Sequence, residues 1–130
     1  MFTINPKLKL LLGSLIVAAV LLLAVVLGLS AGKNLAQAET VAASAQSLAK
    51  AFEYFYNDQG RFPTAVEFTN QNVMLNYLSG YNLPSFTSKI CSDSLQYKKA
   101  LNGGYVLDFC LPTAARNYAK GWNKIQSGAQ

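Results

Sequence analysis

The sequence predicts an α+β fold in which a long N-terminal helix, membrane-spanning over its first half, packs by its distal half against a small antiparallel β-sheet domain. Three observations predict it: an uncharged apolar run near the N-terminus, an apolar seam directly after it, and two strand-like segments around a glycine turn. The expected organisation is a short N-terminus over residues 1–9, an apolar helix over 10–32, its amphipathic continuation over 33–57 and a globular head over 58–130.

The apolar run predicts a membrane-spanning helix. No charged residue occurs from Leu10 to Gly32, and aliphatic residues fill most of that stretch. A helix of about 20 residues covers roughly 30 Å, the hydrocarbon thickness of a bilayer. In lipid such a segment satisfies its backbone groups only as a helix. The chain is therefore expected in a membrane, or in an assembly that draws its subunits from one.

The flanking charges predict the orientation of this span. Lys7 and Lys9 precede the apolar run, whereas only Lys33 follows it closely. The positive-inside rule then places the N-terminus in the cytoplasm and residues 34–130 outside. A secretory signal peptide cleaved after Ala38 is an alternative, although the apolar run is longer than the usual signal core of about 7–15 residues.

The two cysteines lie in the part that is expected outside the membrane. Disulfides persist in such oxidising compartments, and two cysteines allow a single pairing, Cys91 with Cys110. A link of this loop length contributes on the order of 3 kcal/mol. The alternative is a pair of buried free thiols.

An apolar seam of heptad type continues the helical pattern beyond the membrane run. Six residues recur at spacings of three and four, which places them on one helix face: Ala38, Val41, Ala45, Leu48, Phe52 and Phe55. The bulky members, Leu48, Phe52 and Phe55, are expected to pack against the head. The alternative to one continuous helix is two helices hinged between Gly28 and Lys33.

Turn-forming residues predict where the helix ends. The segment from Asn57 to Gly60 consists of turn formers, and Pro63 prevents the helix from resuming. Thr64 and Glu67 have the spacing of a capping box, which predicts a short helix starting near Ala65. Its buried side is expected to comprise Val73, Met74, Tyr77 and Leu78.

Two strands and a hairpin turn are predicted in the second half of the head. The segments 95–101 and 105–111 flank Asn102-Gly103-Gly104, a strong hairpin signal. The tail over 112–130 has no firm period and is expected to cover the sheet through Tyr118 and Trp122. The alternation on the second strand predicts one shared face for Tyr105, Leu107, Phe109 and Leu111.

Little in the sequence suggests enzymatic chemistry. Histidine, the commonest general base and metal ligand, is absent. The four acidic residues outside the long helix are not clustered in the sequence, and no phosphate-binding glycine loop or nucleophile motif occurs: Asp58, Glu67, Asp93 and Asp108. We therefore expect no catalytic residue, no metal site and no cofactor.

The helix exit resembles that of type IV pilins and type II secretion pseudopilins. In those families a tyrosine-rich final helical turn leads into an Asp-x-Gly-x-aromatic-Pro-Thr exit, and the chain reads AFEYFYNDQGRFPT over residues 51–64. The stretch YKKALNGGYVLDFCL over 97–111 is similar to the hairpin of small pilin-like proteins. The positions that match the exit are Asp58, Gly60, Phe62, Pro63 and Thr64, after Tyr54 and Tyr56.

This resemblance implies a pilin-like fold and a structural role. The expected function is a pilin or pseudopilin-like subunit of a type IV pilus or type II secretion-like filament, assembling through its apolar helix. The implied partners are further copies of the chain, the membrane and the assembly machinery. The implied location is the cytoplasmic membrane, crossed once, or a surface filament. The alternative is a single-pass anchored accessory domain, or a DNA-capturing one, that does not polymerise.

The sequence departs from the pilin pattern at its N-terminus. Pilin precursors carry a leader that ends in glycine, and the mature chain has glutamate as its fifth residue. Here Phe2 follows methionine, and the fifth residue counted from it is Pro6. Cleavage before Ser14 would place Ala18 fifth, and no acidic residue precedes Glu39. The sequence therefore lacks a clear prepilin peptidase site and the glutamate at mature position five.

A positive charge balance permits a nucleic-acid interpretation. The chain has 11 basic and 6 acidic residues, for a formal net charge of +5. Some pilins of competence systems capture DNA through basic and aromatic side chains, which bind phosphates and bases respectively. The corresponding strip here comprises Lys98, Lys99, Arg116, Lys120 and Trp122. The alternative is a generally basic surface close to anionic lipid.

Overall fold

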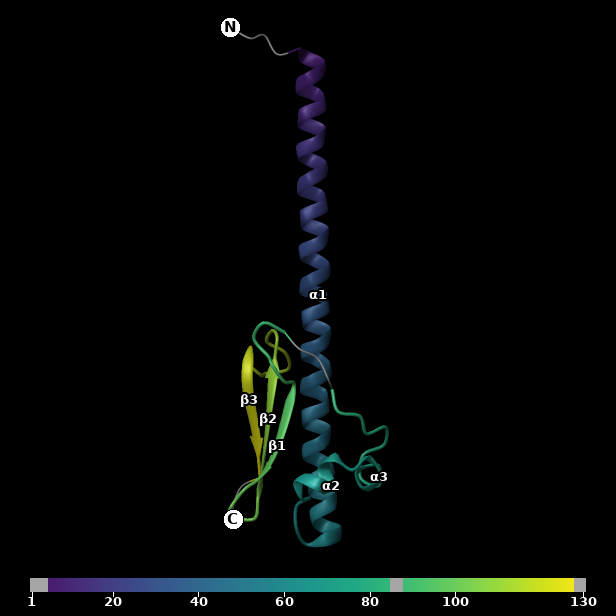
Figure 1. Cartoon of the computed structure of the whole chain (residues 1–130), viewed down its shortest axis with the longest axis vertical. Helices are drawn as coiled ribbons and strands as arrows, with labels where there is room; N and C mark the ends of the chain where they lie inside the picture. Colours follow the sequence, from purple (N-terminus) through teal and green to yellow (C-terminus); the bar gives the residue numbers. More distant parts are fainter. Residues whose placement is uncertain (1–4, 85–87, 128–130) are drawn as a thin grey trace. The chain divides into compact units, whose positions relative to one another are not determined.

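The computed structural model describes residues 5–84 and 88–127, and it shows an α+β layout with a long N-terminal helix and a small antiparallel sheet (Figure 1). Helix α1 extends over Pro6–Gln59 without an interruption between Gly28 and Lys33, so the alternative of two hinged helices is not observed. The residues that could begin a mature pilin at Phe2 lie outside the described part. The chain divides into two compact units, Met1–Lys33 and Asn34–Gln130, which are described separately.

The first unit is the apolar part of α1. A strongly apolar stretch of 18 residues within it has no buried residue, and the helix is long and apolar enough to cross a membrane. A signal sequence near the N-terminus meets the same criterion of length and composition. Leucine and alanine, both good helix formers, are frequent in this segment, and the only proline of α1, Pro6, occupies the first helical position.

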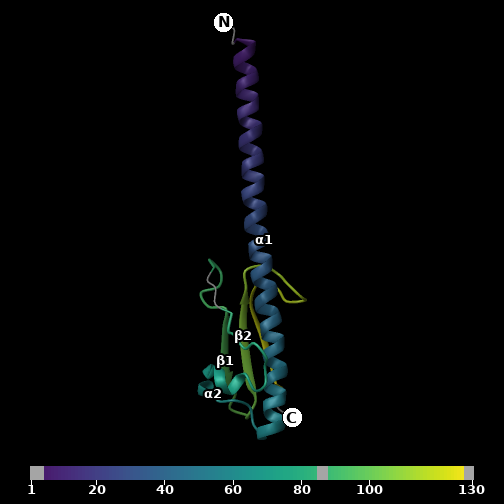
Figure 2. The ribbon, with the colours of Figure 1, turned by 90° about the vertical axis from the view of Figure 1, so that its right-hand side faces the viewer.

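In the second unit, the remainder of α1 lies alongside the sheet, as both views show (Figures 1 and 2). All six residues of the predicted seam are buried there, together with Ala42 and Ala51, which lie beside the seam on the same helix face. The seam has small residues at its start and large aromatic residues at its end. Phe52 is central, since its ring contacts those of Phe68, Tyr97 and Tyr105.

The sheet has three antiparallel strands in the order β1-β2-β3: β1 over Leu95–Lys99, β2 over Tyr105–Leu111 and β3 over Gly121–Gln126. The predicted face of β2 is buried, and the seam of α1 that packs against it is buried too. On the other side of the sheet, Cys91 and Cys110 are also buried. In the register, Tyr97 pairs with Leu107 and Leu107 pairs with Ile125, so these side chains share the inner face. That face packs in one core cluster with α1.

The prediction for the tail was wrong in one respect, because residues 121–126 form a third strand. Tyr118 covers the sheet as expected, with its ring 4.8 Å from that of Phe109 at an angle of 89°. Trp122 does not, since it pairs with Cys110 on the outer face and is half exposed. The tail can return to the sheet because a two-residue turn at Arg116 and Asn117, both with positive φ, joins Ala115 to Tyr118.

Two further predicted boundaries differ from the structure. The first strand ends at Lys99 rather than at Leu101, because Ala100 and Gly104 already hydrogen-bond across the turn and leave Leu101 fully exposed. The segment after the helix exit forms two short helices, α2 over Ala65–Thr69 and α3 over Gln71–Met74. Asn70 ends the first and caps the second, accepting a hydrogen bond from the Asn72 N–H.

Candidate functional site

The apolar surface of the first unit is the most extensive candidate for an interaction. The large aliphatic side chains from Leu8 to Leu29 are between 50% and 76% exposed, on every side of the helix. Soluble proteins rarely expose an apolar surface of this size. The described residues of this unit offer no other element to cover it, since α1 alone runs through them.

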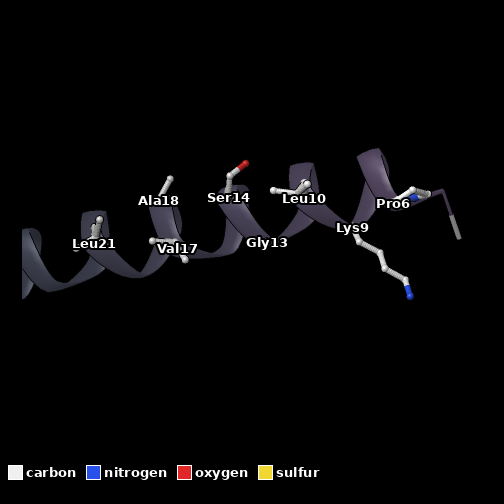
Figure 3. Close-up of a pocket in the computed structure, with 8 residues that line it drawn as sticks. All are labelled: Pro6, Lys9, Leu10, Gly13, Ser14, Val17, Ala18 and Leu21. Atoms are coloured by element: carbon white, nitrogen blue, oxygen red, sulfur yellow. The ribbon is translucent and has the colours of Figure 1, made fainter.

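A shallow groove with both small and large side chains lies along one side of this helix. Gly13, Ser14 and Ala18 lie along a shallow groove with Leu10, Val17 and Leu21 beside them (Figure 3). A methyl group added at Gly13 would meet no atom within 4 Å, so the surface there is open. The Ser14 hydroxyl donates a hydrogen bond to the Leu11 carbonyl oxygen at 2.9 Å and therefore costs little in lipid. Small residues allow a second helix to approach closely.

The predicted helix-exit residues form a tight turn. Gly60 adopts φ = +71°, a left-handed conformation that favours glycine, and its N–H donates to the Tyr56 carbonyl oxygen at 2.8 Å. The Asp58 carboxylate accepts hydrogen bonds from the Tyr77 hydroxyl at 2.6 Å and the Gln59 amide at 2.8 Å. These bonds lower the pKa of Asp58, the one from Tyr77 more strongly. Asp58 thus fastens the helix end to the segment after α3.

Thr64 and Glu67 form the predicted capping box at the start of α2. The Glu67 N–H donates to Thr64 Oγ1 at 3.2 Å, and the Thr64 N–H donates to Glu67 Oε2 at 2.8 Å. Arg61 binds the same carboxylate through both terminal nitrogens, at 2.7 and 2.8 Å. The hydrogen bond from Arg61, followed by that from the Thr64 backbone, lowers the pKa of Glu67 to about 2.

Phe62 and Pro63 attach the exit to the sheet. The ring of Phe62 lies 4.9 Å from that of Tyr105, and the Tyr97 hydroxyl donates to the Pro63 carbonyl oxygen. Burial raises the pKa of both tyrosines to about 12, so the hydroxyl groups stay protonated at neutral pH. All five exit residues therefore have a structural part in joining α1, α2 and the sheet.

The predicted disulfide is present. Cys91 and Cys110 are bonded with a Cα–Cα distance of 5.6 Å, and both are buried. Cys110 lies on β2, on the face opposite the helix, while Cys91 belongs to the segment before β1. The bond fixes that segment to the outer face of the sheet. The Cys110 N–H also donates a hydrogen bond to the Ser94 carbonyl oxygen.

The predicted DNA-contacting residues do not form one continuous strip. Lys98 and Trp122 belong to the outer face of the sheet, whereas Lys99 is at the end of the opposite face and Lys120 is in the loop before β3. Lys98 Nζ lies 3.5 Å from Asp108 Oδ2. Arg116 binds Glu39 at 2.9 Å and Gln46 at 3.2 Å on α1.

The predicted strip omitted Lys124, which the register pairs with Asp108 on the outer face. No local signal placed it there, because the strand that carries it was not predicted. Within residues 5–84 and 88–127, no group of three or more Asp, Glu, Cys or His side chains is arranged to hold a metal ion.

Comparison with known proteins does not assign a family. No family model matches the chain, and no curated protein or solved structure matches it either.

Proposed function

We propose that the chain is a pilin-like structural subunit of a type IV pilus or type II secretion-like filament. The observation that carries this proposal is the apolar helix, which is exposed on all sides in the first unit, whereas the second unit has a buried core of its own. Lipid and a bundle of like helices are similarly apolar, so moving the apolar helix from the membrane into a filament core loses little hydrophobic free energy. Packing between the helices then decides whether the filament forms. The face of Gly13, Ser14 and Ala18 is the contact between copies.

The proposed orientation has residues 34–130 outside the cytoplasm. The disulfide supports it, because such bonds persist in oxidising compartments. Lys7 and Lys9 support it as well, since they precede the span as the positive-inside rule requires. In a filament, the apolar helices would form the core while the heads face the solvent.

Electron microscopy of sheared surface material, labelled for this protein, tests the assembly. We expect labelled filaments from the wild type, and their loss in Ala18→Leu, because the larger side chain fills the groove. Ala19→Leu is the matched control: it adds the same group about 100° around the helix from Ala18, at a position that does not line the groove. Filaments should persist in this control.

Two outcomes would contradict the proposal in favour of named alternatives. If the chain is found only in membrane fractions and as a monomer, the result supports the single-pass anchored accessory domain. An intact mass that corresponds to residues 39–130 would identify a secreted module that is released by cleavage after Ala38. Equal loss of filaments in both leucine variants would argue that the groove is not the contact.

A further inference from the structure

A polar cleft of about 750 Å³ lies in the head, between the last turns of α1 and the turn that joins β1 to β2. Its volume falls within the range of about 300–1,000 Å³ that is common for small-molecule sites. It is formed by three separate segments: the end of α1 with its exit, the hairpin turn and the end of β3. All of them belong to the second unit, so the cleft does not depend on the apolar helix.

An aromatic ring forms one wall of this cleft. Tyr56 is 45% exposed, and its ring lies 4.8 Å from that of Phe62 at an angle of 32°. Phe62 is itself buried and makes an edge-to-face contact with Tyr105. The tyrosine ring is thus supported from behind while its other side stays accessible. An apolar ring face with a polar rim suits a ligand that is itself amphipathic.

The remaining lining is rich in groups that form hydrogen bonds. Glu53 and Asn57 come from the same side of α1 as Tyr56, Asn102 comes from the hairpin turn, and Gln126 comes from the end of β3. All four side chains are exposed. Amides both donate and accept hydrogen bonds, and a carboxylate accepts on two oxygens, so together they match a ligand that carries several hydroxyl groups.

The charges of the cleft offset one another. Glu53 and Lys99 have opposite signs, and the guanidinium of Arg61 is already bound to Glu67 by two hydrogen bonds. A site for phosphate or another anion would retain an excess of cationic donors. The balance here favours a neutral ligand.

From these observations we infer that the cleft binds a neutral oligosaccharide. The C–H face of a sugar ring lies on Tyr56, and its hydroxyl groups bind Glu53, Asn57, Asn102 and Gln126. This inference goes beyond the proposed assembly and is independent of it, because a solubilised monomer contains the complete cleft.

Calorimetric titration of the full chain tests the inference. The protein is held in a zwitterionic detergent, because detergents with sugar headgroups would compete for the cleft. Maltotriose, lactose and N,N′-diacetylchitobiose are the probes, and saturable binding of at least one with a Kd near or below about 1 mM is expected. Tyr56→Ala should weaken that binding at least about tenfold.

The matched control is Tyr54→Ala, which removes a tyrosine that is 62% exposed on the same helix but outside the cleft. It should leave the affinity unchanged. Gln126→Ala is a second cleft variant that does not alter the aromatic packing, and it should also weaken binding. Thermal unfolding of each variant verifies that the head remains folded.

Three results would overturn the inference. The first is the absence of saturable binding for all three sugars, and the second is an equal loss in Tyr54→Ala and Tyr56→Ala. The third is binding of inorganic phosphate alone that Lys99→Ala removes, which would identify an anion site. Sugar binding without filaments would contradict only the assembly, and filaments without sugar binding would contradict only the cleft.

Discussion

Glu67 shows how one side chain can connect three parts of the head. Its carboxylate accepts from Arg61 in the helix exit and from the Thr64 N–H, while its own N–H donates to Thr64. The ion pair with Arg61 has two hydrogen bonds, a geometry that strengthens it relative to a single contact. As a consequence, the Glu67 carboxylate stays charged at a pH at which an ordinary glutamate is already protonated.

The pKa of Glu67 predicts a loss of stability in acid. A carboxylate whose folded-state pKa is lowered stabilises the folded state above its unfolded pKa, and this contribution is lost as the pH falls to the folded pKa of about 2. Because the group is partly exposed, solvent screening limits the contribution to about 1 kcal/mol. Urea unfolding of wild type and Glu67→Gln should differ by that amount at pH 7, and the difference should decrease towards pH 2.

The control for this prediction is Glu53→Gln, because Glu53 forms no ion pair with the residues that the structure describes. Its difference from the wild type at pH 7 should be small. A difference for Glu67→Gln that stayed constant from pH 7 to pH 2 would show that the charge of Glu67 does not contribute.

Gly60 is the residue at which the exit depends on backbone conformation. At φ = +71° an alanine would place its methyl group against the backbone, with an expected loss of about 1 kcal/mol in the free energy of unfolding. Apart from the adjoining backbone, no atom lies within 4 Å of the position of that methyl group, so the loss arises from backbone conformation and not from packing. In chemical denaturation, the free energy of unfolding of Gly60→Ala should be lower than that of Gly60→Asn, because asparagine tolerates this conformation. Equal stability of all three proteins would contradict it.

At the scale of elements, the helix seam is the main contact between α1 and the sheet within the head. Phe52 is fully buried, and the ring centroids of Tyr97 and Tyr105 lie 5.1 and 4.8 Å from its own. Phe52→Ala should therefore lower the free energy of unfolding by about 3–5 kcal/mol in denaturant titrations. Tyr54→Ala, two residues away on the exposed side, should change it by less than about 0.5 kcal/mol. Similar losses in both variants would contradict the packing of the seam.

The elements that were predicted from sequence have strong local signals. The seam repeats at the helical period over six positions, and the pair of strands flanks an Asn-Gly-Gly turn. The capping box at Thr64 and Glu67 is also local, since both hydrogen bonds join residues three apart. In each case neighbours in sequence determine the structure, so a single sequence was sufficient.

Strand β3 was not predicted because small and polar residues occupy two of its inner positions and an aromatic residue occupies an outer one. Its inner positions include Gly121 and Asn123, while the large aromatic Trp122 is on the outer face. Asn123 is accommodated because its amide donates to the carbonyl oxygens of Ala119 and Gly121. The strand forms through pairing with β2, a contact that depends on the turn at residues 116–117 and that no local pattern reveals.

The sites that depend on distant residues were likewise beyond a single sequence. The pairing of Arg116 with Glu39 joins residues 77 positions apart, and the cleft beside Tyr56 combines three segments. The basic strip was inferred from composition, which does not reveal that Lys98 faces Asp108 or that Arg116 is held by α1. Sequence therefore predicted the layout better than the surface.

At the scale of the whole molecule, the disulfide connects the segment before β1 to the central strand. It closes a loop with a sequence separation of 19 residues, which corresponds to about 3 kcal/mol of stabilisation. The variant Cys91→Ala/Cys110→Ala should lose about this amount in denaturant unfolding. The wild type in the presence of a reductant should approach the same value. An unchanged unfolding midpoint in both experiments would contradict this contribution.

The core of the head is independent of the apolar helix. Every buried residue of the described chain lies between Ala38 and Ala115, and none belongs to the unit that ends at Lys33. A fragment that begins at Asn34 retains the whole seam, the sheet and the disulfide. We therefore expect it to fold cooperatively without detergent, to unfold within a few degrees of the full chain, and to lose membrane association. Circular dichroism and fractionation would measure both properties. A fragment that stayed unfolded would show that the head needs the apolar helix for its stability.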